Sequence, residues 1–298
     1  MELRKNSDHN PDSVNWKNKD YLQSLVKLSG EFEEMNTRTS KFQNQSIDIE
    51  LMPMFTVFLW NAGYDKVLLY DAYNKSHYYT NIIKLTNHPD LIIDSTCRNE
   101  IEHQSRLIDS AVNIPVSLFK RAISYAALKN YNNAFSDYDS ALSIDSSFIL
   151  VYFSRAGSRY DLIQFIQSLD KDEDAVSIGI DAPKVNTQIT SKDLENTYEM
   201  VNQDLTRAIE IDPHFYFAYY NRGVVNCKIG NYKKAIDDFS EAIHYRNNFA
   251  EAIYNRGLIY ILLNENQKGC EDLSRAGELG ILDAYKVMKR YCFRSARE

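Results

Sequence analysis

Four aspartates in the middle of the chain are spaced as in a calcium-binding loop. Asp170, Asp172 and Asp174 stand at the first, third and fifth positions of such a loop, and Asp181 stands at the twelfth. Carboxylate oxygens at these positions can coordinate a hard cation. The sixth position is Ala175, where the turn needs glycine, and the twelfth is not the bidentate glutamate. We therefore expect a solvated acidic loop and no metal site, with calcium-linked regulation as the weaker alternative.

No other group of residues predicts catalysis. The six histidines show no HExxH pattern and no paired spacing. No serine stands in a nucleophile elbow, and a glycine-rich phosphate loop is absent from the sequence. We expect a protein without enzyme activity and without a cofactor.

Arginine recurs at a regular spacing of 34, 67 and 34 residues: Arg121, Arg155, Arg222 and Arg256. Guanidinium groups suit carboxylates, so the series can be interpreted as an anion-binding ladder. We favour a structural role, in which the alkyl stems pack between helices and the charged heads pair with acids of the next helix. The nearest such acids are Asp137, Asp237 and Asp238.

The residues around these arginines define a repeat. The aligned first helices are 118–122, 152–156, 219–223 and 253–257, and the aligned second helices carry Tyr131, Ala134, Tyr138 and Ala141 or Tyr232, Ala235, Phe239 and Ala242. This pattern resembles the tetratricopeptide repeat, a helix hairpin of 34 residues. Small residues at the helix contact allow close approach, and each hairpin covers the apolar stripe of the next. The resemblance implies a mainly α fold, a right-handed superhelix of antiparallel hairpins.

The repeat divides the chain into four parts. Residues 1–45 are polar and poorly defined, and 46–112 form a small α+β element. Four hairpins follow over 113–281, and the spacing of 67 places an insertion at about 170–190 in the second. Residues 282–298 form a capping helix and a tail.

The segment before the repeats predicts a β-hairpin. Met54–Trp60 and Lys66–Tyr73 are β-prone, and a turn over 61–65 can join them. Ile82–Leu85 can add a third short strand, and Glu100–Val112 is helical. Because two strands alone are marginally stable, this hairpin should pack on the first repeat or on another partner.

Composition excludes several classes of protein. At 44% hydrophobic residues the chain is not disordered, and a net charge of -7 without a dense basic cluster argues against nucleic-acid binding. No apolar run reaches the length of a membrane span, and the start carries no targeting segment, so we take the cytoplasm as the default location. The four cysteines are widely spaced, and we expect buried or idle thiols.

The resemblance extends beyond the repeats to about Phe42–Cys292. The stretches 42–55, 182–184 and 276–280 are similar to the carboxy-terminal part of longer bacterial tetratricopeptide proteins. That similarity implies either a fragment or a shortened relative of a protein with more repeats upstream. If the chain is a piece of a longer exported protein, the expected location is the cell envelope or periplasm. It implies no activity.

The predicted function is recognition of a protein or peptide by the concave face of the first helices. Aromatic rings supply buried area at low rotamer cost, and asparagine can pair with a peptide backbone. The residues at this face are Phe119, Phe153, Tyr160, Phe217, Tyr220, Asn221, Tyr254 and Asn255. In the alternative, the rings pack between neighbouring helices and the array is an architectural spacer of a larger protein.

Overall fold

The computed structural model describes residues 51–59, 83–86, 94–169 and 191–292. The elements in chain order are β1 (Thr56–Leu59), β2 (Ile83–Thr86), α2 (Asp94–Asp109), α3 (Ile114–Ala127), α4 (Tyr131–Ile144), α5 (Ile149–Leu169), α6 (Ser191–Ile211), α7 (Tyr216–Lys228), α8 (Tyr232–Tyr245), α9 (Ala250–Leu262), α10 (Asn266–Glu278) and α11 (Asp283–Tyr291). The fold is mainly helical.

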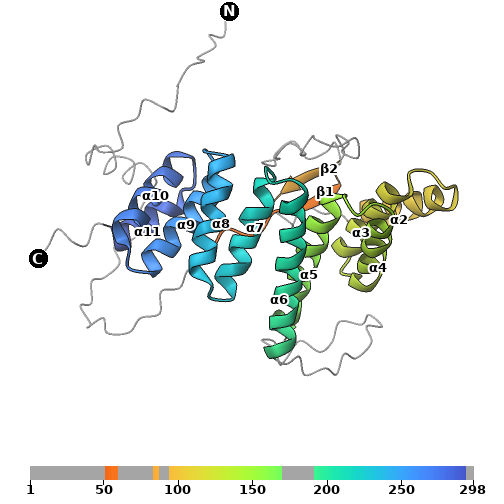
Figure 1. Cartoon of the computed structure of the whole chain (residues 1–298), viewed down its shortest axis with the longest axis horizontal. Helices are drawn as coiled ribbons and strands as arrows, with labels where there is room; N and C mark the ends of the chain where they lie inside the picture. The colour runs from red at the N-terminus through yellow and green to blue at the C-terminus, as the bar shows by residue number, and fades with distance from the viewer. Residues whose placement is uncertain (1–50, 60–82, 87–93, 170–190, 293–298) are drawn as a thin grey trace, which may run out of the picture.

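Consecutive helices from α3 to α10 pair into hairpins, which follow one another along the long axis of the molecule (Figure 1). We call α3, α5, α7 and α9 the A helices, and α4, α6, α8 and α10 the B helices. Small residues allow the two helices of a hairpin to approach closely. A Cβ added to Gly223 on α7 would lie 2.7 Å from the Phe239 ring on α8, and Ala235 and Ala242 are fully buried. The hairpin geometry thus depends on the small residues of the repeat.

A left-handed residue ends the A helices of three hairpins. Lys129, Gly230 and Asn264 have φ of 60°, 78° and 62°. The amide of each donates to a carbonyl oxygen three residues earlier, which satisfies part of the helix end. Glycine and asparagine adopt this conformation most readily, which explains their recurrence at the turn.

The second hairpin is longer than the others. Helices α5 and α6 each have 21 residues, whereas α7 has 13 and α8 has 14. The residues predicted as the insertion, 170–190, lie between these two helices and outside the described residues. The predicted polar segment 1–45 also lies outside them.

The two described strands correspond to the first and the third of the predicted strands. Strand β1 is antiparallel to β2, with Thr56 opposite Thr86 and Leu59 opposite Ile83. The expected pairing of Met54–Trp60 with Lys66–Tyr73 is not shown, since 60–82 lie outside the described residues. The first expected strand pairs with the third. Turn signals at 61–65 carry no information about this more distant partner.

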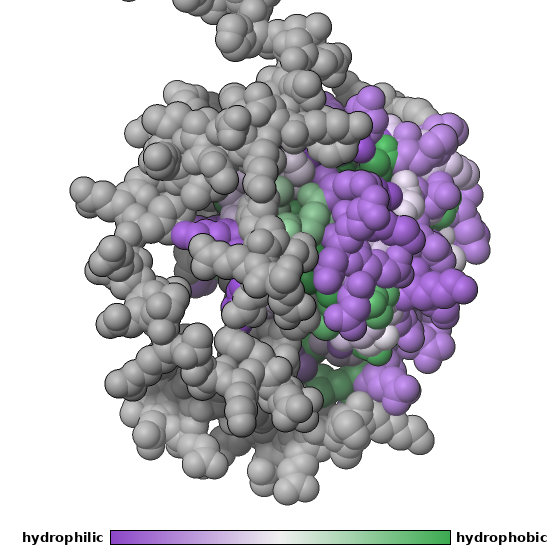
Figure 2. Space-filling model, turned by 90° about the vertical axis from the view of Figure 1, so that its left-hand side faces the viewer, coloured by the Kyte–Doolittle hydropathy of each residue, from purple (hydrophilic) through white to green (hydrophobic). Residues whose placement is uncertain are grey.

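Hydrophilic residues dominate the described surface at the α10 and α11 end of the stack, and hydrophobic residues show between them and the grey atoms (Figure 2). Within the described residues, no helix is long and apolar enough to cross a membrane.

The expectation that all four cysteines are thiols was wrong for two of them. Cys270 on α10 and Cys292 after α11 form a disulfide with a Cα–Cα distance of 5.8 Å. This pairing depends on how α11 packs on α10, which cysteine spacing does not show. Cys97 and Cys227 are free and buried, and burial raises the pKa of the Cys227 thiol to about 12.

Reduction of this disulfide should destabilise the carboxy-terminal end of the stack. The bond closes a loop of 22 residues, and a loop of this size contributes about 3 kcal/mol in the chain-entropy model. Urea unfolding with and without dithiothreitol measures the difference. A Cys270→Ser, Cys292→Ser variant should be insensitive to the reductant. An unchanged midpoint for the reduced parent would contradict the expected contribution.

Candidate functional site

The periodic arginines are held inside the stack by acids of the B helices. Arg121 donates from Nε and Nη2 to Asp137 at 2.7 and 2.8 Å, and from Nη1 to Ser105 Oγ at 3.0 Å. The hydrogen bond to Asp137 raises the pKa of Arg121. The same arrangement recurs with Arg222, Asp238 and Thr206 and with Arg256, Asp272 and Ser240. Each guanidinium therefore joins one hairpin to the preceding helix.

The predicted partners Asp137 and Asp238 are confirmed, whereas Asp237 is exposed. In the long hairpin, Arg155 binds Asp139 and Asp204, and Arg159 also contacts Asp204. Burial lowers the pKa of Arg159, although the charge of Asp204 acts in the opposite direction. These pairings favour a structural role for the arginines over an anion-binding ladder.

An extended segment of the chain itself lies across the A helices. Met52 contacts α9, Phe55 contacts α7, and Thr56 approaches α5, where a Cβ added to Gly157 would lie 3.8 Å from Thr56 Cγ2. Strand β1 continues against α5 and α3. The segment Leu51–Leu59 thus crosses the A helices in the reverse of their chain order (Figure 1). We call the surface of the A helices that this segment covers, with Tyr220, Asn221 and Asn255, the A-helix face.

Two asparagines bind the backbone of this segment. Asn221 Oδ1 accepts from the Phe55 amide at 2.9 Å, and its Nδ2 donates to the Phe55 carbonyl oxygen at 2.8 Å. Asn255 makes the same pair with Met52, at 2.8 and 3.2 Å. Both asparagine side chains are fully buried. Each carboxamide therefore replaces the backbone partner that a neighbouring β-strand would supply.

The Tyr220 hydroxyl lies between the two asparagine contacts. It donates toward the carbonyl oxygens of Met52 and Pro53, both at 3.0 Å, and accepts from Asn255 Nδ2 at 3.1 Å. This hydroxyl orients the Asn255 carboxamide while it binds the segment.

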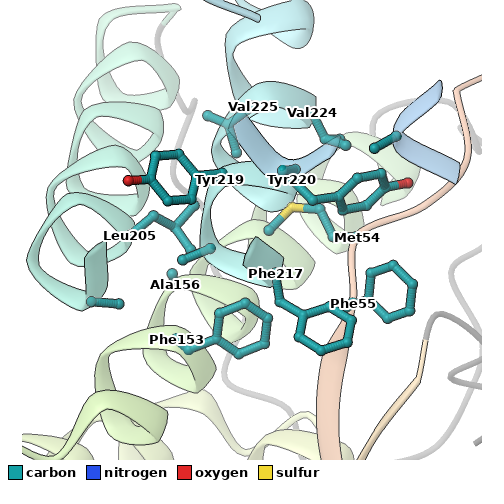
Figure 3. Packing of buried hydrophobic residues seen from close by; sticks show 14 of the residues in the cluster. Met54, Phe55, Phe153, Ala156, Leu205, Phe217, Tyr219, Tyr220, Val224 and Val225 are labelled. Carbon is teal, nitrogen blue, oxygen red and sulfur yellow. The ribbon is translucent and has the colours of Figure 1, made fainter. Parts of the chain in front are cut away.

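The ring of Phe55 packs into a cluster of aromatic side chains. Its centroid lies 4.9 Å from Phe217, 5.2 Å from Tyr220 and 5.6 Å from Phe249. Phe217 and Tyr220 point from α7 toward Phe55 and Met54 (Figure 3). Phe55 is fully buried and Pro53 is exposed. The segment is therefore held by its backbone at the two asparagines, and by the buried ring of Phe55, the residue directly before β1.

The spacing of the two asparagines matches the geometry of an extended chain. Asn221 and Asn255 occupy equivalent positions one repeat apart, and they bind residues three apart, Phe55 and Met52. Three extended residues span about 10 Å. One residue in three can thus meet an asparagine from successive A helices.

Two tetratricopeptide-repeat family models match the chain, one over residues 116–148 and one over 216–249. The matched stretches begin within α3 and at the start of α7, two of the A helices. The chain therefore contains tetratricopeptide repeats. No curated protein matches the sequence.

Several solved structures resemble this repeat protein. A crystal structure of MamA is 16% identical, with a TM-score of 0.45, and the match covers 67% of this chain and 99% of that chain. A thermophilic TPR protein in Thermus thermophilus is 14% identical, with a TM-score of 0.47 and coverage of 64% and 88%.

Four of the predicted site residues contact the segment Leu51–Leu59: Phe217, Tyr220, Asn221 and Asn255. Three of the others pack on rings of the stack. Phe119 packs on Phe148 at 5.0 Å, Phe153 on Phe215 at 5.1 Å and Tyr160 on Tyr198 at 6.4 Å. Tyr254 is buried. Phe119 and Phe153 are fully buried in the stack, as expected for rings that pack between helices.

Sequence reasoning missed Phe249 and the bound segment itself. A signal for Phe249 exists, because phenylalanine precedes three A helices in register at Phe148, Phe215 and Phe249, 67 and 34 residues apart. The segment carries no such signal, since its contacts join residues 166 and 203 positions apart.

A titratable group with a shifted pKa lies outside the A-helix face, on α5. Burial raises the pKa of Asp161 on α5, with Lys129 acting in the opposite direction. No three His, Cys, Asp or Glu residues in the described ranges are grouped to hold a metal ion. The acidic loop Asp170–Asp181 lies outside those ranges, so its interpretation stays a prediction.

Proposed function

We propose that the chain is a non-catalytic interaction scaffold that binds an extended segment of a protein along the A-helix face. In this proposal the four hairpins of 113–281 form a right-handed superhelix, with the A helices on its concave side. The observation that carries the proposal is the pairing of Asn221 and Asn255 with both backbone polar groups of residues in an extended segment.

Backbone pairing suits recognition of an extended chain. Main-chain hydrogen bonds supply affinity for many sequences, and side-chain pockets supply selectivity. Here the aromatic cluster of Phe217, Tyr220 and Phe249 supplies the pocket. An extended ligand with an aromatic residue fits both features.

An architectural role is the second candidate, and one observation favours it. The chain's own segment satisfies the two asparagines and fills the aromatic cluster. A face that its own chain occupies permanently would stiffen the array and bind nothing else.

Panning of a short random peptide library against the full chain separates the two candidates. We expect enrichment of peptides with an aromatic residue, and loss of that enrichment in an Asn221→Ala, Asn255→Ala variant. Each substitution removes both partners of one backbone residue, and an unpaired buried group costs about 1–3 kcal/mol. The exposed Asn248→Ala is the matched control.

Tyr220→Ala is unsuitable for this test, because Tyr220 is fully buried and its loss would disturb the core. Tyr220→Phe removes only the hydroxyl that contacts the segment. Peptides that bind the parent and the double asparagine variant equally, with both proteins folded, would exclude the A-helix face as the binding surface.

A further inference from the structure

The contacts of the bound segment fall into two kinds. Residues 51–53 are half-buried or exposed, and Met52 is held through its backbone. Met54 and Phe55 are buried, and Phe55 combines a backbone pair with an aromatic cluster. The A-helix face therefore recognises a short pattern. One residue is bound through its backbone, and the residue three positions later is bound through both its backbone and its aromatic ring.

We propose that Leu51–Phe55 is an exchangeable resident of the A-helix face, and that it competes with a partner segment of the same pattern. The inference rests on the proposed function and adds the chemistry of the partner, an extended segment with phenylalanine three residues after a backbone-paired residue. Both asparagine pairs contact backbone atoms that every partner residue except proline provides.

The aromatic cluster explains the requirement for phenylalanine. Three rings surround Phe55 at centroid distances between 4.9 and 5.6 Å, in tilted and edge-on arrangements that aromatic pairs prefer. A smaller side chain would leave a void among these rings. The partner residue opposite Asn255 is less restricted, since the Met52 side chain is only half-buried.

Covalent attachment gives the resident its advantage. A tethered segment acts at a high effective concentration, so a free segment with identical contacts binds weakly until the resident is loosened. Resident and partner then share one face, and occupancy by the partner requires release of Leu51–Phe55.

The test measures binding of a fluorescent peptide of residues 46–58 to the full chain by anisotropy. Two variants weaken the binding of the resident segment and substitute no residue of the repeats. Phe55→Ala removes the buried ring, and Met52→Pro removes the amide that donates to Asn255 Oδ1. Both should lower the Kd of the peptide by about tenfold or more, because competition from the tether falls.

Two controls give the result its meaning. Met200→Ala changes an exposed apolar residue on α6 and should bind like the parent. A peptide with alanine in place of Phe55 should bind neither variant, which shows that the probe occupies the aromatic cluster.

Equal Kd values for the parent and both folded variants, with binding still dependent on the phenylalanine of the peptide, would contradict the competition between resident and partner. The proposed function would then still hold. Absence of binding to all folded proteins would overturn both, because the face would then accept no segment from outside the chain.

Discussion

Phe55→Ala is expected to lower the free energy of unfolding by about 3–5 kcal/mol, the range for loss of a buried aromatic side chain. Phe55 is fully buried, although it lies far outside the repeats in sequence, and its ring contacts Phe217, Tyr220 and Phe249. Removal of the ring leaves a cavity among these side chains and loosens the hold on the segment. Urea unfolding followed by far-ultraviolet circular dichroism measures the loss.

Pro53→Ala is the matched control for this substitution. Pro53 belongs to the same segment and is exposed, so its replacement should change the free energy of unfolding by about 1 kcal/mol or less. If Phe55→Ala behaved like Pro53→Ala, the segment would not be docked on the A-helix face.

Asp238→Ala should also cost about 3 kcal/mol, because it leaves the partly buried Arg222 charge and the buried Asn226 side chain without their partner. Asp238 accepts from Arg222 and from Asn226, at 2.7 and 2.8 Å. Denaturant unfolding measures the effect. The neighbouring Asp237 is exposed, and Asp237→Ala should stay within about 0.5 kcal/mol of the parent.

A double variant tests the physical reason for this cost. Burial raises the pKa of Asp238, while Arg222 and Asn226 act to lower it, so desolvation of the carboxylate opposes the attraction of the pair. Replacement of both charges, Arg222→Leu with Asp238→Leu, should therefore lose less stability than Asp238→Ala alone. A greater loss in the double variant would show that the pair itself stabilises the hairpin.

The repeat register could be predicted from sequence because it depends on local periodicity. The arginine spacing located the A helices, and it located the B-helix acids Asp137 and Asp238. Periodicity treats Phe119, Phe153 and Tyr220 alike, yet the two phenylalanines pack on rings of the stack while Tyr220 binds the segment. Which part of the face a distant segment crosses depends on long-range contacts, and a repeat pattern contains no information about them.

The partner of β2 and the disulfide were not predicted, for a related reason. Turn residues at 61–65 predict pairing of adjacent β-prone runs and give no indication of the more distant pairing of β1 with β2. Cys270 and Cys292 meet because α11 folds back on α10, a contact between helices that cysteine spacing does not reveal. Local chemistry predicted the elements, and the choice of partner required the packed structure.

Amide hydrogen exchange at Met52 and Phe55, followed by NMR, is the most direct test of how the A-helix face holds the segment. Both amides donate to buried asparagine oxygens, so both should exchange slowly in the parent protein. Asn255→Ala should accelerate exchange mainly at Met52, and Asn221→Ala mainly at Phe55. Fast exchange at both amides in the folded parent would contradict the asparagine pairing, and with it the proposed mode of recognition.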